Sequence, residues 1–159
     1  NLFKDELLVK NPELNGSSVI QLDKDKVTEF IIVDYQFQKI QFTDNKNNSL
    51  SGFFEILVKT DSIIYYKKHS KKIIRKENKK IRYYEFKDNN SYYVYYNDNY
   101  FRLKKINDLN AIFPNYKTPL KNIYARYKSI RKTYPDTYIK SILLDLYNVM
   151  FSNTNSLRI

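Results

Sequence analysis

The chain lacks cysteine altogether, although it has 159 residues. A disulfide framework and a cysteine-based metal site are therefore excluded. At this length a single domain can bury a hydrophobic core without covalent cross-links. The absence of cysteine leaves the cellular compartment open, because many periplasmic proteins also lack disulfides.

Glycine is almost as scarce, and only Gly16 and Gly52 occur. Two isolated glycines exclude the Gly-rich loops that cradle phosphates and the G-x-S-x-G turn of hydrolases. The sequence therefore carries no motif of a nucleotide-binding or serine-hydrolase site.

The chain has a single histidine, His69, and its neighbours in sequence are lysines. A catalytic or metal-binding histidine needs an orienting carboxylate or further ligands. We interpret His69 as an exposed loop residue, and Glu55, Asp61 and Glu85 as ordinary strand charges. The sequence predicts no catalytic residue, no metal site and no cofactor, so we expect a protein that is not an enzyme.

No apolar run approaches the roughly 18 residues that a membrane-spanning helix needs. The chain starts at Asn1 rather than at methionine. We expect a processed product, from which an export signal or a tag was removed.

Basic residues outnumber acidic ones by 28 to 17, which gives a formal net charge of +11. Such an excess attracts anionic partners, including nucleic acid, acidic lipids and acidic glycans. The abundance of Lys, Asn, Ile and Tyr is also typical of coding from an AT-rich genome. A basic surface without a specific anionic partner therefore remains an alternative.

From Val27 onward, branched and aromatic residues alternate with polar ones, a pattern typical of β-strands. The apolar positions change phase near Gln38, which predicts a bulge or a break there. In residues 53–58, Phe54, Ile56 and Val58 are predicted to share one face. We expect five or six antiparallel strands in a meander between about Val27 and Lys104.

After Lys105 the apolar spacing becomes helical. Thr118 and Pro119 are predicted to begin one helix whose apolar stripe reaches Ile130, and Pro135 begins another. Strands followed by helices indicate an α+β fold. Residues 1–26 are predicted to be a weakly structured lead-in with a short strand. Residues 27–151 are predicted to form a single domain, with the sheet in 27–105 and the helices in 106–151. Residues 152–159 are predicted to be a polar tail.

Two stretches hold most of the positive charge: residues 67–80 have eight basic residues and one acid, and residues 117–132 have six and none. Consecutive tyrosines flank the first stretch and recur after it. Since neighbours in a strand point to opposite faces, each pair is predicted to send one ring to the core and one outward. The candidate contact surface therefore combines outward tyrosines with a basic edge: Tyr92, Tyr93, Tyr95, Tyr96, Lys67, Lys68, Lys71, Lys72, Arg75 and Lys76.

Several segments occur in a suggestive order: "GFFEILVKTDSIIYYKK", "SYYVYYNDNYFRLKKINDLNAIFPNYKTPLKNI" and "LLDLYN". Together they resemble uncharacterised exported proteins of Bacteroidota. That group has a G-x-F-F-E-x-L strand, a Tyr-rich hairpin, a helix ending in F-P and a C-terminal helix ending in Y-N. The resemblance implies an envelope protein in the periplasm or outer membrane, with the cytoplasm left open, and it carries over no catalytic residue.

We expect a non-catalytic binding or accessory module of a bacterial cell envelope that contacts another protein. The alternative is a nucleic-acid-binding module that uses residues 67–80 and 117–132. Peripheral contact with an anionic surface is a further option, and an enzyme with an unrecognised site is the weakest.

Overall fold

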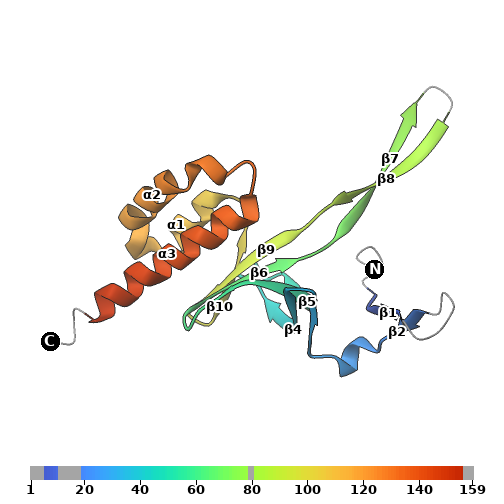
Figure 1. Ribbon diagram of the computed structural model, residues 1–159, viewed down its shortest axis with the longest axis horizontal. Coiled ribbons are helices and arrows are strands. Elements are labelled where there is room, and N and C mark those ends of the chain that lie inside the picture. The colour runs from blue at the N-terminus through green and yellow to red at the C-terminus, as the bar shows by residue number, and fades with distance from the viewer. Residues whose placement is uncertain (1–5, 11–18, 79–80, 156–159) are drawn as a thin grey trace.

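The computed structural model describes residues 6–10, 19–78 and 81–155. It confirms the α+β class, because antiparallel strands come first along the chain and three helices follow (Figure 1). The helices form one layer on the sheet, and a long two-stranded ribbon projects from the sheet away from them.

Six of the strands form one antiparallel sheet in the order β10-β9-β6-β5-β4-β3. Neighbours in the chain are neighbours in this sheet, except that β7 and β8 leave it between β6 and β9. Two further pairs, β1 with β2 and β7 with β8, stand apart from it. The strands are β1 (Leu8–Lys10), β2 (Val19–Gln21), β3 (Glu29–Ile32), β4 (Tyr35–Thr43), β5 (Ser49–Lys59), β6 (Ile63–Lys68), β7 (Lys71–Asn78), β8 (Ile81–Asp88), β9 (Ser91–Tyr96) and β10 (Asn99–Leu103).

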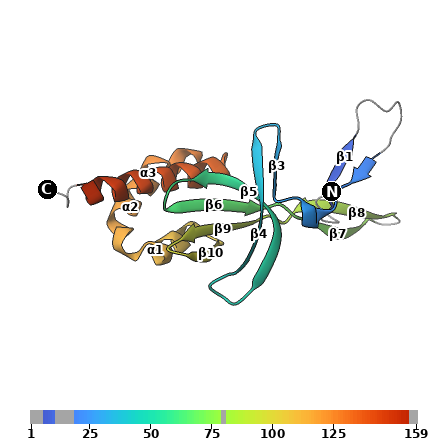
Figure 2. The same ribbon diagram turned by 90° about the horizontal axis from the view of Figure 1, so that it is seen from below.

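The sheet is strongly curled, so that β4 and the first part of β5 cross the direction of β6, β9 and β10, while the end of β5 runs beside β6 (Figure 2). The curl brings the end of β4 back to β10. Asp44 bridges Tyr100, and the Asn45 amide donates to the Tyr100 carbonyl at 3.1 Å. The inner side of the curl encloses an aromatic core of Phe42, Phe54, Tyr66 and Tyr93.

The long strand β5 bends in two ways that favour this curl. Its register with β6 shifts between Ile56 and Val58, so a bulge moves Val58 to the helix side while Phe54 and Ile56 face the curl. The prediction that Val58 shares their face is therefore wrong. Gly52 has a φ of 124°, a backbone conformation that residues with a side chain rarely adopt. A Cβ atom added there would lie 3.0 Å from Lys68 Nζ.

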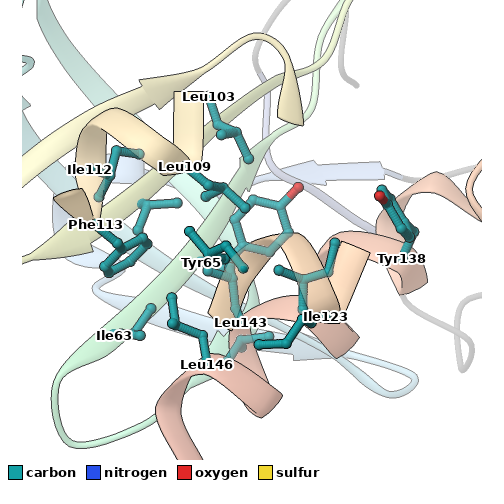
Figure 3. Close-up of a cluster of buried hydrophobic side chains, with 14 residues drawn as sticks. Ile63, Tyr65, Leu103, Leu109, Ile112, Phe113, Ile123, Tyr138, Leu143 and Leu146 are labelled. Carbon is teal, nitrogen blue, oxygen red and sulfur yellow. The ribbon is translucent and has the colours of Figure 1, made fainter. Parts of the chain in front are cut away.

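The helices α1 (Leu109–Ile112), α2 (Lys117–Arg126) and α3 (Pro135–Asn155) cover the other face of the sheet. Apolar side chains at helical spacing on α3, including Ile142, Leu143 and Leu146, are fully buried. They pack with Ile63 and Tyr65 of β6 in the larger core (Figure 3).

The break in the first long strand is not where the sequence predicted it. The register of β4 with β5 is uniform through Gln38, whereas the chain turns earlier, at Val33, which has a φ of 56°. The apolar positions around Gln38 change phase for another reason. Phe37 packs on Phe30 on one side of the sheet, and Phe42 faces the curl on the other.

Helix boundaries also differ from the predictions. The α2 helix begins at Lys117 without a side-chain cap, so Thr118 is not its cap, and it ends at Arg126. The Ile130 end of the predicted stripe belongs to a separate 3-10 turn. The α3 helix begins at Pro135 as predicted, and it continues to Asn155, into the segment predicted to be a polar tail.

Candidate contact surface

The strands β6 to β9 form one long hairpin with an unbroken register. Ile63 lies opposite Tyr96, Lys68 opposite Ser91, Lys71 opposite Asp88 and Asn78 opposite Ile81. Only the first half, β6 with β9, belongs to the main sheet. The second half, β7 with β8, is here called the arm. Both views show it projecting beyond the sheet and helices (Figures 1 and 2).

The arm exposes apolar and aromatic side chains on both of its faces. Tyr84 is 65% exposed and Phe86 55% exposed, and they lie opposite Arg75 and Ile73 respectively. Because alternate residues point to opposite faces, the adjacent Tyr83 lies on the other face, where it is also exposed. A two-stranded ribbon has no layer of its own to cover such side chains.

Ion pairs on the arm involve all three of its acids. Lys71 Nζ lies 2.5 Å from Asp88, and Lys76 Nζ lies 2.6 Å from Glu85. The hydrogen bond from Lys76 lowers the pKa of the Glu85 carboxyl, and that from Lys71 does the same for Asp88.

The third acid, Glu77, pairs with Arg82 at 3.3 Å. Lys72 and Arg75 form no ion pair with a described carboxylate. Residues 71–88 contain eight basic and three acidic residues, so the arm as a whole is positive by 5.

The junction of the arm with the sheet is held by side chains and by one backbone hydrogen bond. His69 Nε2 lies 2.5 Å from Oε2 of Glu55, a buried carboxylate of β5. The Ser70 amide donates to Asn90 Oδ1 at 3.1 Å, and the Asn89 amide donates to the Ser70 carbonyl at 2.8 Å. The interpretation of His69 as an exposed loop residue is wrong, because it is half-buried and paired with Glu55. This pair ties the arm to the body of the sheet.

The predicted contact tyrosines lie in the body and not on the arm. Tyr93 is buried inside the curl, and the half-buried Tyr96 packs on Phe113 at 4.7 Å between ring centroids. The Tyr95 hydroxyl donates to Asp98 at 2.8 Å. Both faces of β9 are therefore covered, one by the helices and one by the curl.

The remaining predicted residues divide between body and arm. Lys67 and the Tyr92 hydroxyl both reach Asp136 of α3, at 2.6 and 2.8 Å. Burial, and then Asp136, raise the pKa of the Tyr92 hydroxyl. Lys68 donates to the Ser51 carbonyl at 2.5 Å. The predicted residues that lie on the arm are Lys71, Lys72, Arg75 and Lys76.

The sequence-based site missed the apolar residues of the arm. The local pattern around Tyr83, Tyr84 and Phe86 is typical of a strand, and by itself it does not indicate that this strand leaves the sheet. The pairing register of the hairpin, rather than the local pattern, shows how far this strand extends beyond β6 and β9. Pairing Tyr66 with Tyr93, as in the structure, puts Ile73 opposite Phe86 in the same register.

Within the described ranges, no group of three or more His, Asp or Glu side chains could hold a metal ion. None of the helices in that part of the chain combines the length and the apolar character needed to cross a membrane. Comparison of the chain with protein-family models, curated proteins and solved structures finds no match.

Proposed function

We propose that this protein is a non-catalytic binding or accessory module of a bacterial cell envelope, and that its arm contacts another protein. One observation carries the proposal. The arm exposes Tyr83 and Tyr84, and within the described residues its two strands pack extensively only on each other. Exposed apolar patches of this kind mark interaction surfaces. The envelope location rests on the resemblance to exported proteins of Bacteroidota.

The charge of the arm defines the partner more closely. Its excess of five positive charges favours a partner surface with acidic residues around an apolar groove. Aromatic residues and arginine are the side chains that most often dominate binding energy in interfaces. The facing pair of Arg75 and Tyr84 is therefore the expected centre of the contact.

The test is site-specific photo-crosslinking in native envelopes. A photoreactive residue replacing Tyr84 should give one defined crosslinked protein, and the Phe86→Ser substitution should abolish that product. The matched control replaces Tyr134, which is 61% exposed but lies just before α3. A crosslinked product at position 134 but none at 84, or no defined product at either position, would contradict the proposal.

Nucleic-acid binding is the second candidate, because a cation and an aromatic ring face each other at Arg75 and Tyr84. Aromatic stacking beside basic residues is how single strands are bound. Affinity for an oligonucleotide should then fall steeply with salt and fall further in a Tyr84→Ser variant. The second stretch, residues 117–132, lies on α2 and the turn after it, within the helical layer and away from the arm (Figure 1). A short single-stranded oligonucleotide would therefore bind to the arm alone.

A further inference from the structure

A groove lies on the body, between the turn that follows β4, the strand β10 and the short helix α1. Its volume is about 500 Å³, within the range of small-molecule sites. Its lining includes the aromatic residue Phe101 and four cationic residues: Lys46, Arg102, Lys104 and Lys105.

The curl of the sheet assembles this groove from distant segments. The Asp44–Tyr100 bridge and the hydrogen bond from the Asn45 amide hold the turn against β10. Asp44 is buried and fixes the turn by accepting from the Lys46 and Asn48 amides, both at 2.9 Å. Lys46 and Arg102 thereby line the same groove.

The cations that line the groove outnumber its one lining acid, Asp108. Within the described residues, no carboxylate forms an ion pair with Lys46, Arg102, Lys104 or Lys105. Asp108 also lines the groove, but its Oδ2 atom accepts from the backbone amides of Lys104 and Lys105 at 2.8 and 3.0 Å. Asp44 acts on Arg102 only through space, since its oxygens bind the amides of its own turn. The groove therefore has a concentrated positive charge.

We propose that this groove binds a phosphate ester. A phosphomonoester carries nearly two negative charges and several acceptor oxygens, which suits a cluster of lysines around one arginine fork. The organic part of the ester would lie against Phe101. A soluble phosphate ester and a phospholipid head group share this chemistry.

Calorimetric titration at low ionic strength tests the proposal, with phenyl phosphate as the probe and phenol as the uncharged comparison. Phenyl phosphate should bind with saturation and phenol should not. The Arg102→Gln/Lys104→Gln variant should lose affinity by about tenfold or more, since hydrogen bonds to charged groups contribute about 1.5–3 kcal/mol.

The matched control is Lys128→Gln/Lys132→Gln, which removes the same charge from exposed positions outside the groove. It should change affinity by less than about twofold. If the double variant does not fold, the single variant Lys46→Gln, which changes an exposed turn, takes its place in the titration. The proposal would be overturned if no probe shows saturable binding to the protein. An equal loss of affinity in the groove variants and in the control variant would also overturn it.

Vesicle flotation distinguishes the two sources. Vesicles that contain phosphatidic acid present a phosphomonoester, whereas phosphatidylglycerol presents only a diester of lower charge. Binding to the former that depends on Arg102 supports the head group, and binding of phenyl phosphate alone supports a soluble ligand. The Phe86→Ser variant should bind the probe normally, so failure of the arm proposal would leave this one intact.

Discussion

The two halves of the long hairpin have one pairing register and opposite environments. Tyr65 and Tyr66 at its base are 1% and 2% exposed, whereas Tyr83 and Tyr84 on the arm are 46% and 65% exposed. The same dipeptide, in the same kind of strand, is core in one half and surface in the other. Strand pairing alone therefore does not decide burial. The layers that cover the strand decide it: here the helices on one side and the curl of the sheet on the other.

The comparison also separates the part of the hairpin that stabilises the fold from the part that is available for contact. Side chains at the base contribute to two cores. Among the described residues, side chains on the arm belong to neither of these cores.

The largest expected effect is that of Phe54→Ala, which empties the centre of the curl. Phe54 is fully buried, and such truncations cost about 3–5 kcal/mol in free energy of unfolding. Urea denaturation measures it. A loss below about 1 kcal/mol would show that the curl is not a packed core.

The buried tyrosines should make the body sensitive to alkali. Burial raises the pKa of Tyr66 to about 12 and raises the pKa of Tyr65 as well. Above pH 10 the unfolded chain loses these phenolic protons while the folded chain keeps them. Stability is thus complete below pH 10 and falls as the pH rises toward 12, by up to ~1.4 kcal/mol per pH unit for each such group.

Unfolding measured between pH 9 and 12 checks this, with Tyr66→Phe predicted to flatten the slope. Tyr84→Phe, which removes an exposed hydroxyl, is the control. Equal slopes in Tyr66→Phe and in the unsubstituted protein would be inconsistent with the expected behaviour.

The junction between the two halves should depend on His69. Replacing His69 by alanine leaves the buried Glu55 carboxylate without its partner, which should destabilise the protein by about 1–3 kcal/mol. It should also broaden the distribution of distances between arm and body.

Spin labels at Arg75→Cys and Lys140→Cys can measure that distribution, because the chain has no cysteine of its own. His69→Gln keeps a donor and should preserve a narrow distribution. A distribution that is equally narrow in the alanine variant would show that the pair does not orient the arm.

The smallest expected effect is that of Phe86→Ala, which makes the same change as Phe54→Ala but on the arm. Because Phe86 is 55% exposed, the free energy of unfolding should change by no more than about 0.5 kcal/mol. Urea denaturation beside the Phe54 variant gives the direct comparison. A loss of several kcal/mol would mean that the arm packs on the body in solution.

The sequence predicted the α+β class because periodicity is local, and periods of two and of 3.6 residues separate cleanly at Lys105. It misplaced the break in the first strand because the phase of Phe37 and Phe42 depends on which sheet face is covered. That choice is tertiary. The bulge at Leu57 was equally hidden, because every residue in 53–58 except Glu55 is apolar and fits either face.

The candidate site was predicted only in part, for the same reason. The basic run was visible as charge, but Lys67 and Lys68 turned out to bind Asp136 and Ser51, which are distant in sequence. The partner of His69 was equally remote. The exposure of Tyr84 could not be read from its strand pattern, which matches that of the buried Tyr66.

The unbroken register also bears on how the chain reaches its fold. Ile63 and Tyr96 are far apart in sequence, and closing that loop in one step would cost considerable chain entropy. If pairing starts with Asn78 and Ile81 at the far end of the arm and proceeds inward, each step closes only a short loop. Pairing of β7 with β8 would then bring β6 and β9 together in the correct register. The strands of the proposed contact surface would thus also guide the chain to its central strand pair.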